Sequence, residues 1–167
     1  MIGVYLLAAL SLIGGMAPAR ADSPMPPPAV SQTSSPDGSF RAVADPRSDL
    51  LSVFRRGAST PLWTLRGWRR SFFLANDGEH LVIGPDGLNL LSVDVDEDSA
   101  LLVFMHRTEQ LRVVTVGQLF PGLRGLQRTV SHLAWGVILG VSSQNRLVVD
   151  LVDGRRIEFD VSSGKLQ

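Results

Sequence analysis

Short runs of apolar residues, separated by Gly and Asp-Gly pairs, make up most of the chain after residue 36. The clearest run is Arg156–Val161, in which apolar and acidic side chains alternate. Such alternation puts the apolar residues on one face of a β-strand. The pair Asp153-Gly154 joins this run to Arg146–Val152, which is rich in Val and Leu. Because a tight hairpin turn requires positive φ, Asp-Gly between two such runs predicts a β-hairpin.

The segment NDGEHLVIGPDGLNLL, residues 76–91, carries two more Asp-Gly pairs. Asp77-Gly78 separates the predicted strands Ser71–Ala75 and Glu79–Ile83, and Asp86-Gly87 follows a proline that favours a turn. The chain contains no Gly-x-Gly-x-x-Gly and no Gly-Lys-Ser/Thr run, so a phosphate loop is excluded. The pattern predicts further strands at Phe40–Ala44, Leu50–Arg55, Leu62–Leu65, Leu88–Val93, Leu101–Met105, Gln110–Val116 and Trp135–Val141.

These elements predict an all-β fold, an antiparallel meander of about ten short strands, because short connections favour antiparallel neighbours. At most one short helix is expected, near residues 116–127, where Pro121 and Gly125 interrupt the pattern. PDGSFRAV begins at Pro36 and NDGEHLVI at Asn76, a spacing of about 40 residues that is typical of a four-stranded propeller blade. Four such blades need more than the roughly 130 residues available, so we expect a propeller-blade-like or open sandwich arrangement.

The first residues are typical of an export signal. The apolar run 2–16 is short for a membrane span, and Ala19-Arg20-Ala21 places small residues before a cleavage point. We therefore predict a signal peptide at 1–21, with an uncleaved anchor as the alternative. Residues 22–35 hold four prolines and little to bury, which predicts a disordered linker. A single β-domain at 36–164 and a tail at 165–167 complete the expected organisation.

Composition limits the partners. The chain has 16 basic and 16 acidic residues and no cysteine, so it lacks the charge excess of a nucleic-acid-binding protein and the thiols for disulfides. We expect export to the periplasm or the cell exterior, no membrane span after signal cleavage, and no cofactor.

Two stretches carry a resemblance to known proteins. SPDGSFRAV, residues 35–43, resembles the first-strand motif of TolB-type and WD40-type propeller blades, although the Trp-Asp dipeptide of the WD40 type is absent. Residues 35–164 also resemble a group of uncharacterised exported bacterial β-meander proteins, through WRRSFFLANDGEHLVIG, GLNLL and RTVSHLAWG. The resemblance implies a single β-domain ending near residue 164 and implies no activity.

The best candidate for binding is a basic and aromatic cluster. Arginine beside tryptophan is suited to carbohydrate, carboxylate or phosphate recognition, and it is also common at an exposed sheet edge. The cluster consists of Trp63, Arg66, Trp68, Arg69 and Arg70.

Asp94, Asp96 and Asp98 match the first positions of a calcium loop, whose alternate carboxylates converge on the ion. The match ends there, because Ser99 replaces the required glycine and Met105 replaces the bidentate glutamate. A solvated turn is the alternative interpretation.

The three histidines, His80, His106 and His132, are spaced 26 residues apart and have no paired metal-ligand spacing. Ser131 and His132 are neighbours, whose side chains we expect to point apart, so we predict no nucleophile and base pair there.

We therefore expect an exported, non-enzymatic β-domain that acts as a binding or interaction module in the cell envelope. The partner would be an unknown envelope protein or glycan, or a second copy joined through sheet edges. The alternatives are an enzyme whose site combines His80, His132 and the acids near Asp94, and a calcium-stabilised extracellular module.

Overall fold

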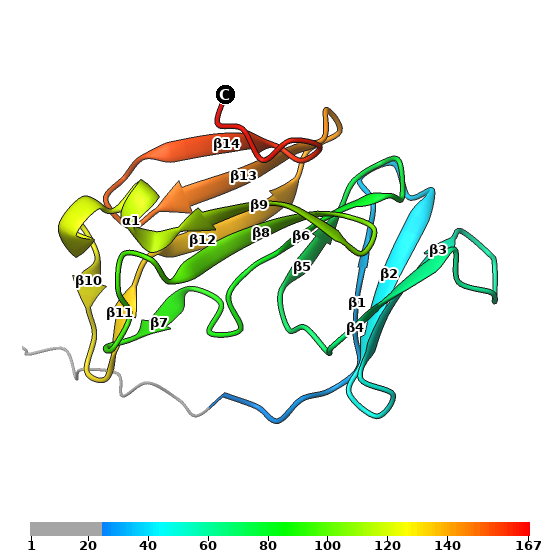
Figure 1. The fold of residues 1–167 in the computed structure, drawn as a ribbon, viewed down its shortest axis with the longest axis horizontal. Coiled ribbons are helices and arrows are strands. Elements are labelled where there is room, and N and C mark those ends of the chain that lie inside the picture. The colour runs from blue at the N-terminus through cyan, green and yellow to red at the C-terminus, as the bar shows by residue number, and fades with distance from the viewer. Residues whose placement is uncertain (1–24) are drawn as a thin grey trace, which may run out of the picture.

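A computed structural model describes residues 25–167, so the predicted signal peptide lies outside the described part. This part is all-β, with 14 strands in four antiparallel sheets and one short α-helix (Figure 1). The N-terminal sheet has the order β1 (Ser31–Ser34), β2 (Phe40–Asp45), β3 (Leu50–Arg55), β4 (Trp63–Arg66). The central sheet has the order β5 (Phe72–Leu74), β6 (His80–Ile83), β8 (Ala100–His106), β9 (Glu109–Thr115).

Two further sheets follow. The C-terminal sheet has the order β12 (Gly136–Val141), β13 (Arg146–Leu151), β14 (Arg156–Asp160). The small sheet has the order β10 (Gln127–Arg128), β11 (His132–Ala134), β7 (Leu90–Ser92). The helix α1 (Val116–Leu119) and a 3₁₀ turn (Pro121–Leu123) occupy the segment where one short helix was expected. Within residues 25–167, no helix is long and apolar enough to cross a membrane.

The central sheet is buried on both faces. Leu81 and Met105 belong to the core shared with the N-terminal sheet, whereas Val82 and Phe104 belong to the core shared with the C-terminal sheet. Alternate residues of a strand point to opposite faces. The wholly apolar run at 101–105 is therefore explained by a strand that fills two cores at once. The three large sheets pack as successive layers (Figure 1).

The small sheet is built from two insertions. One connects β6 to β8 and contains β7, and the other connects β9 to β12 and contains α1 and β11. The two insertions pair through β7 and β11, with Ser92 opposite His132. The fully buried Trp135 fixes them to the core, because its indole Nε1 donates a hydrogen bond of 2.7 Å to the Leu88 carbonyl oxygen.

The predicted Asp-Gly corners are confirmed. Asp37-Gly38, Asp77-Gly78 and Asp153-Gly154 join β1 to β2, β5 to β6, and β13 to β14, and Asp86-Gly87 lies in a turn. Gly38 and Gly78 have φ of 71° and 69°, which glycine adopts without steric cost.

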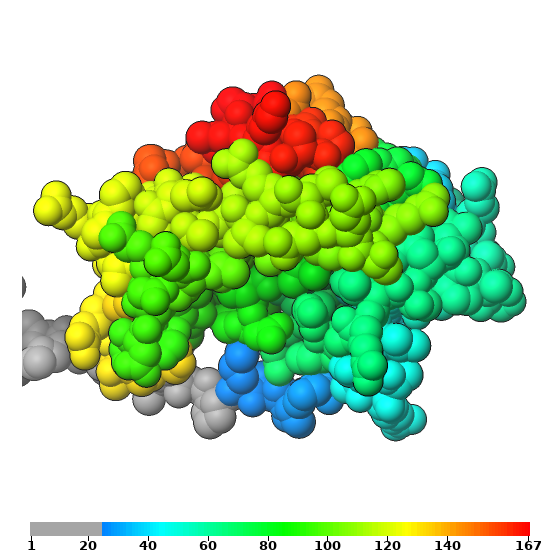
Figure 2. All heavy atoms as spheres, viewed as in Figure 1, coloured from blue at the N-terminus to red at the C-terminus, as the bar shows by residue number. Residues whose placement is uncertain are grey.

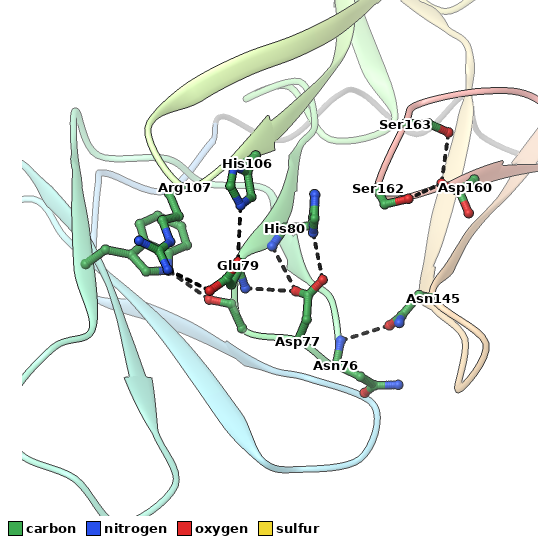
Figure 3. Close-up of polar contacts among 12 residues, drawn as sticks. Asn76, Asp77, Glu79, His80, His106, Arg107, Asn145, Asp160, Ser162 and Ser163 are labelled. Atoms are coloured by element: carbon green, nitrogen blue, oxygen red, sulfur yellow. Dashed lines mark hydrogen bonds and ion pairs between the residues drawn. The ribbon is translucent and has the colours of Figure 1, made fainter.

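The corners that join the first two strands of each large sheet are linked to one another through Asn76. Its backbone N–H donates to Asn145 Oδ1 at 2.8 Å, and its side-chain Nδ2 donates to the Ser143 carbonyl oxygen at 3.0 Å. In the other direction, Asn76 Oδ1 accepts a hydrogen bond of 2.9 Å from the Asp37 backbone N–H. A single amide residue therefore fixes the three layers at one end, and Figure 3 shows the link to Asn145.

The folded sheet begins earlier than the sequence indicates. The structure places the edge strand β1 at Ser31–Ser34, inside the segment expected to be a disordered linker, and pairs it with residues 41–44 of β2. The polar sequence SQTS has no apolar alternation, so its strand character comes from backbone hydrogen bonds alone. The pattern also missed β10 and β11, which are only two and three residues long.

Replacement of Asn76 by alanine should lower the free energy of unfolding by about 1–3 kcal/mol, because two side-chain hydrogen bonds between layers are lost. Urea unfolding measures the change. Gln144→Ala removes an exposed amide from the neighbouring corner and is the matched control, expected to change stability by less than about 0.5 kcal/mol. Equal losses in the two variants would contradict a linking role for Asn76.

Candidate functional site

An apolar cleft of about 550 Å³ lies between β5 and β12. Phe73 of β5, Ile138 of β12 and Val152 line it, and Leu88 of the first insertion forms part of its wall. Polar groups are few; Ser71 is one of them. A cleft that is mostly apolar with a few polar groups is the usual form of a binding site.

Two strand edges border this cleft. Among the described strands, β5 is paired only with β6, and β12 only with β13. A β-bulge at Leu139 shifts the register between Ile138 and Gly140, and it leaves Leu139 outside the regular pairing. Val137 and Leu139 are 49% and 53% exposed, which is high for aliphatic residues on a strand. The edge of β12 therefore presents apolar side chains together with backbone groups that no described strand pairs.

The residues of the predicted basic and aromatic cluster lie on β4 and in the connection that follows it. Trp63 lies at the start of β4, is partly buried in the core, and donates a hydrogen bond of 2.7 Å from Nε1 to the Gly78 carbonyl oxygen. Arg66 ends the same strand and is exposed. Trp68, Arg69 and Arg70 follow in the connection to β5. Trp63 and Trp68 both pack against the core between the N-terminal and central sheets.

Trp68 and Arg70 do lie together, and the chain itself contacts them. Trp68 Nε1 donates to the Ala29 carbonyl oxygen at 2.9 Å, and Arg70 Nη2 donates to the Pro26 carbonyl oxygen at 2.9 Å. The Arg70 guanidinium is 5.0 Å from the centre of the Trp68 ring. Arg69 donates to the Trp68 carbonyl oxygen at 2.8 Å.

A second cluster unites His80 with His106, which are register partners on β6 and β8 with ring centres 4.8 Å apart. Each histidine has its own carboxylate, since His80 Nδ1 is 2.7 Å from Asp77 Oδ2 and His106 Nε2 is 3.2 Å from Glu79 Oε2. Arg107 donates to Glu79 Oε1 at 2.6 Å (Figure 3). The alternative enzyme site combined His80 with His132, whereas the structure places His80 beside His106.

The carboxylates of this cluster are held in their charged form. The hydrogen bond from Arg107, and then that from His106, lower the pKa of Glu79 below its ordinary value. Partial burial acts to raise the pKa of Asp77, but hydrogen bonds from the backbone N–H groups of His80 and Glu79 and from the His80 ring outweigh it, so the net pKa is lowered. Both carboxylates of the cluster therefore already accept hydrogen bonds from neighbouring residues, as in a structural turn.

The calcium interpretation of Asp94, Asp96 and Asp98 is not supported. Across residues 25–167, no group of three or more acidic or histidine side chains is arranged to hold a metal ion. Asp96 instead accepts a hydrogen bond of 2.5 Å from Ser99 Oγ, and the following Glu97 accepts one of 2.5 Å from the Gly122 backbone N–H. This loop therefore makes local turn contacts and anchors the second insertion.

The expectation that the side chains of Ser131 and His132 point apart is wrong. Ser131 Oγ lies 2.8 Å from His132 Nδ1, although side chains of neighbouring residues were expected to point apart. Thr129 Oγ1 also accepts a hydrogen bond from the His132 backbone N–H at 3.0 Å. The turn between β10 and β11 brings these groups together, and the pairing of β11 with β7 places His132 opposite Ser92, two residues before Asp94.

Comparison with known proteins gives no functional assignment. No family model and no curated protein matches the chain. Among solved structures, it is similar to Kuenenia stuttgartiensis hydrazine synthase, with a TM-score of 0.37, 15% identity, and coverage of 81% of this chain and 34% of that chain. A likeness at this level carries no argument about activity.

The Glu79 interactions should make stability depend on pH. Because the folded-state pKa is below the ordinary value of 4.5, the carboxylate contributes stability above that value, and the contribution is lost as the pH falls through the folded-state pKa. Glu79→Gln should therefore lower the urea midpoint at pH 7 and reduce its fall between pH 5 and pH 3, relative to the native chain. Glu109→Gln, an exposed glutamate at the start of β9, is the control. An identical fall in native chain and Glu79→Gln would refute this role.

Proposed function

We propose that this protein is an exported binding module of the bacterial cell envelope, which takes an extended apolar segment of a partner protein into the cleft between β5 and β12. The observation that carries the proposal is the apolar cleft bordered by two strand edges without a described strand partner. Export is supported by the N-terminal sequence, which has an apolar run followed by a small-residue cleavage pattern.

An extended peptide suits both properties of the cleft. Its backbone can supply the donors and acceptors that an edge strand lacks, and its alternate side chains can enter the apolar space. Six residues of β12 offer enough length for several backbone hydrogen bonds. The exposed Val137 lines the cleft, and the exposed Leu139 lies two residues further along β12. A glycan fits less well, since polar groups are few along this lining.

A second candidate is proton transfer at the histidine and carboxylate cluster. The observation in its favour is that the rings of His80 and His106 lie 4.8 Å apart, each within hydrogen-bond distance of a carboxylate. It ranks second because Asp77 already accepts hydrogen bonds from the backbone of its own corner and Glu79 accepts one from Arg107. Those contacts account for the lowered pKa of each carboxylate without a substrate.

Selection of random octapeptides against the full chain tests the binding proposal. We expect enrichment of peptides with alternating apolar residues. A synthetic copy of an enriched peptide should also slow hydrogen exchange at β12 amides, since a paired amide exchanges less readily. Failure to enrich any peptide, or binding without protection of β5 or β12, would refute the proposed mode.

Lysines at Val137 and Leu139 should weaken binding of the selected peptide about tenfold or more, because charged side chains on an edge strand oppose the addition of an apolar strand. Titration calorimetry measures the affinity. Leu111→Lys introduces the same change at a 40% exposed leucine on β9, the edge strand at the opposite side of the central sheet, and should leave the affinity unchanged.

A further inference from the structure

The segment before β1 has the composition of a polyproline II ligand. Residues 25–30 read Met-Pro-Pro-Pro-Ala-Val, are exposed and form no helix or strand. Consecutive prolines fix φ near the polyproline II value and provide no backbone N–H groups, so such a segment offers carbonyl oxygens as its main polar groups. In Figure 1, this segment runs as a blue trace along the lower side of the molecule before it enters β1, and Figure 2 shows its atoms as blue spheres on the same side.

Two carbonyl oxygens of this segment are recognised, and they are three residues apart. Trp68 Nε1 donates to Ala29 and Arg70 Nη2 donates to Pro26, each at 2.9 Å. A polyproline II helix has three residues per turn, so carbonyl groups at positions i and i+3 point to the same side. The two donors therefore match the repeat of this conformation, and the backbone is contacted without regard to which side chains it carries.

The loop that carries Trp68 and Arg70 is held in place by hydrogen bonds to Asp49. The Trp68 backbone N–H donates to Asp49 Oδ1 at 2.7 Å, and the Gly67 N–H donates to the Asp49 carbonyl oxygen at 2.8 Å. The Trp68 ring packs against the core between the N-terminal and central sheets, and the Arg70 guanidinium lies over it. An aromatic ring and fixed donors prepared in advance are the means by which proline-rich peptides are bound.

We infer that Trp68 and Arg70 form a binding site for polyproline II peptides, and that the chain's own residues 25–30 occupy it. The site therefore binds the segment before β1 to the surface of the domain, so that this segment is not a flexible linker. Because the segment is joined directly to β1, its effective concentration at the site is in the millimolar range, so even a weak site stays filled. The inference does not depend on the cleft between β5 and β12.

The indole resonances of the three tryptophans test the inference in the full, ¹⁵N-labelled chain. Replacement of Pro26, Pro27 and Pro28 by glycine should weaken docking, because flexible glycine must lose more conformational entropy. The Trp68 indole N–H should then shift and exchange with solvent at least several-fold faster. The Trp63 and Trp135 indoles, which donate to Gly78 and Leu88, should remain unchanged and report that the fold is intact.

A synthetic peptide of residues 25–30, titrated to several millimolar, should return the Trp68 resonance of the glycine variant towards its native position. In that background, Arg70→Met should weaken peptide binding about tenfold and Trp68→Phe about fivefold, since each loses one hydrogen-bond donor. Arg66→Met, at an exposed arginine ending β4, is the matched control and should have no effect.

Several outcomes would overturn the inference. Equal Trp68 indole exchange in the native chain and the glycine variant would show that residues 25–30 do not dock. A glycine variant whose Trp68 resonance ignores the peptide would show that the contacts depend on the chain connection and do not constitute a site. Should the glycine variant fail to fold, rapid indole exchange of Trp68 in the native chain, compared with Trp63, would still refute docking.

Discussion

The central sheet has two apolar faces, and the rest of the fold depends on covering both. Its strands β6 and β8 contribute side chains to two separate cores, one shared with the N-terminal sheet and one with the C-terminal sheet. Removing apolar area from water is worth roughly 25 cal/mol per Å², so neither face is stable when exposed. Each outer sheet needs only one apolar face, which explains why β2, β3 and β13 alternate between buried and partly exposed residues.

The sequence revealed most of the strands because the corners between them have fixed chemistry. The spacing between Pro36 and Asn76 correctly marked two equivalent corners. The equivalent corner between β12 and β13 was not predicted because it has no Asp-Gly pair. Asn145 supplies the positive φ there, at 57°. The two insertions that form the small sheet also displace this corner along the chain. Strand β1 was missed because an edge strand of Ser, Gln and Thr has no apolar period to detect.

The candidate sites were harder to predict, because they depend on register and on contacts between distant segments. His80 and His106 are partners only through the pairing of β6 with β8, although each lies beside a hairpin corner, which was a usable signal. The sequence from Trp63 to Arg70 also did not show that the indoles of Trp63 and Trp68 donate to backbone carbonyl oxygens of the chain itself. The apolar cleft is lined by residues of β5, β12 and both insertions, so no short stretch of sequence could predict it.

The small sheet has a consequence for the order in which the molecule folds and opens. Each large sheet is assembled from strands that lie close together along the chain, and such local pairings form rapidly. The pairing of β7 with β11 joins residues as distant along the chain as Leu90 and Ala134, and it involves only three residue pairs. This pairing should therefore close late and open first among the four sheets. Since Leu88 and Ala134 form part of the cleft wall, a local opening there would change the size of the cleft while the three main layers stay intact.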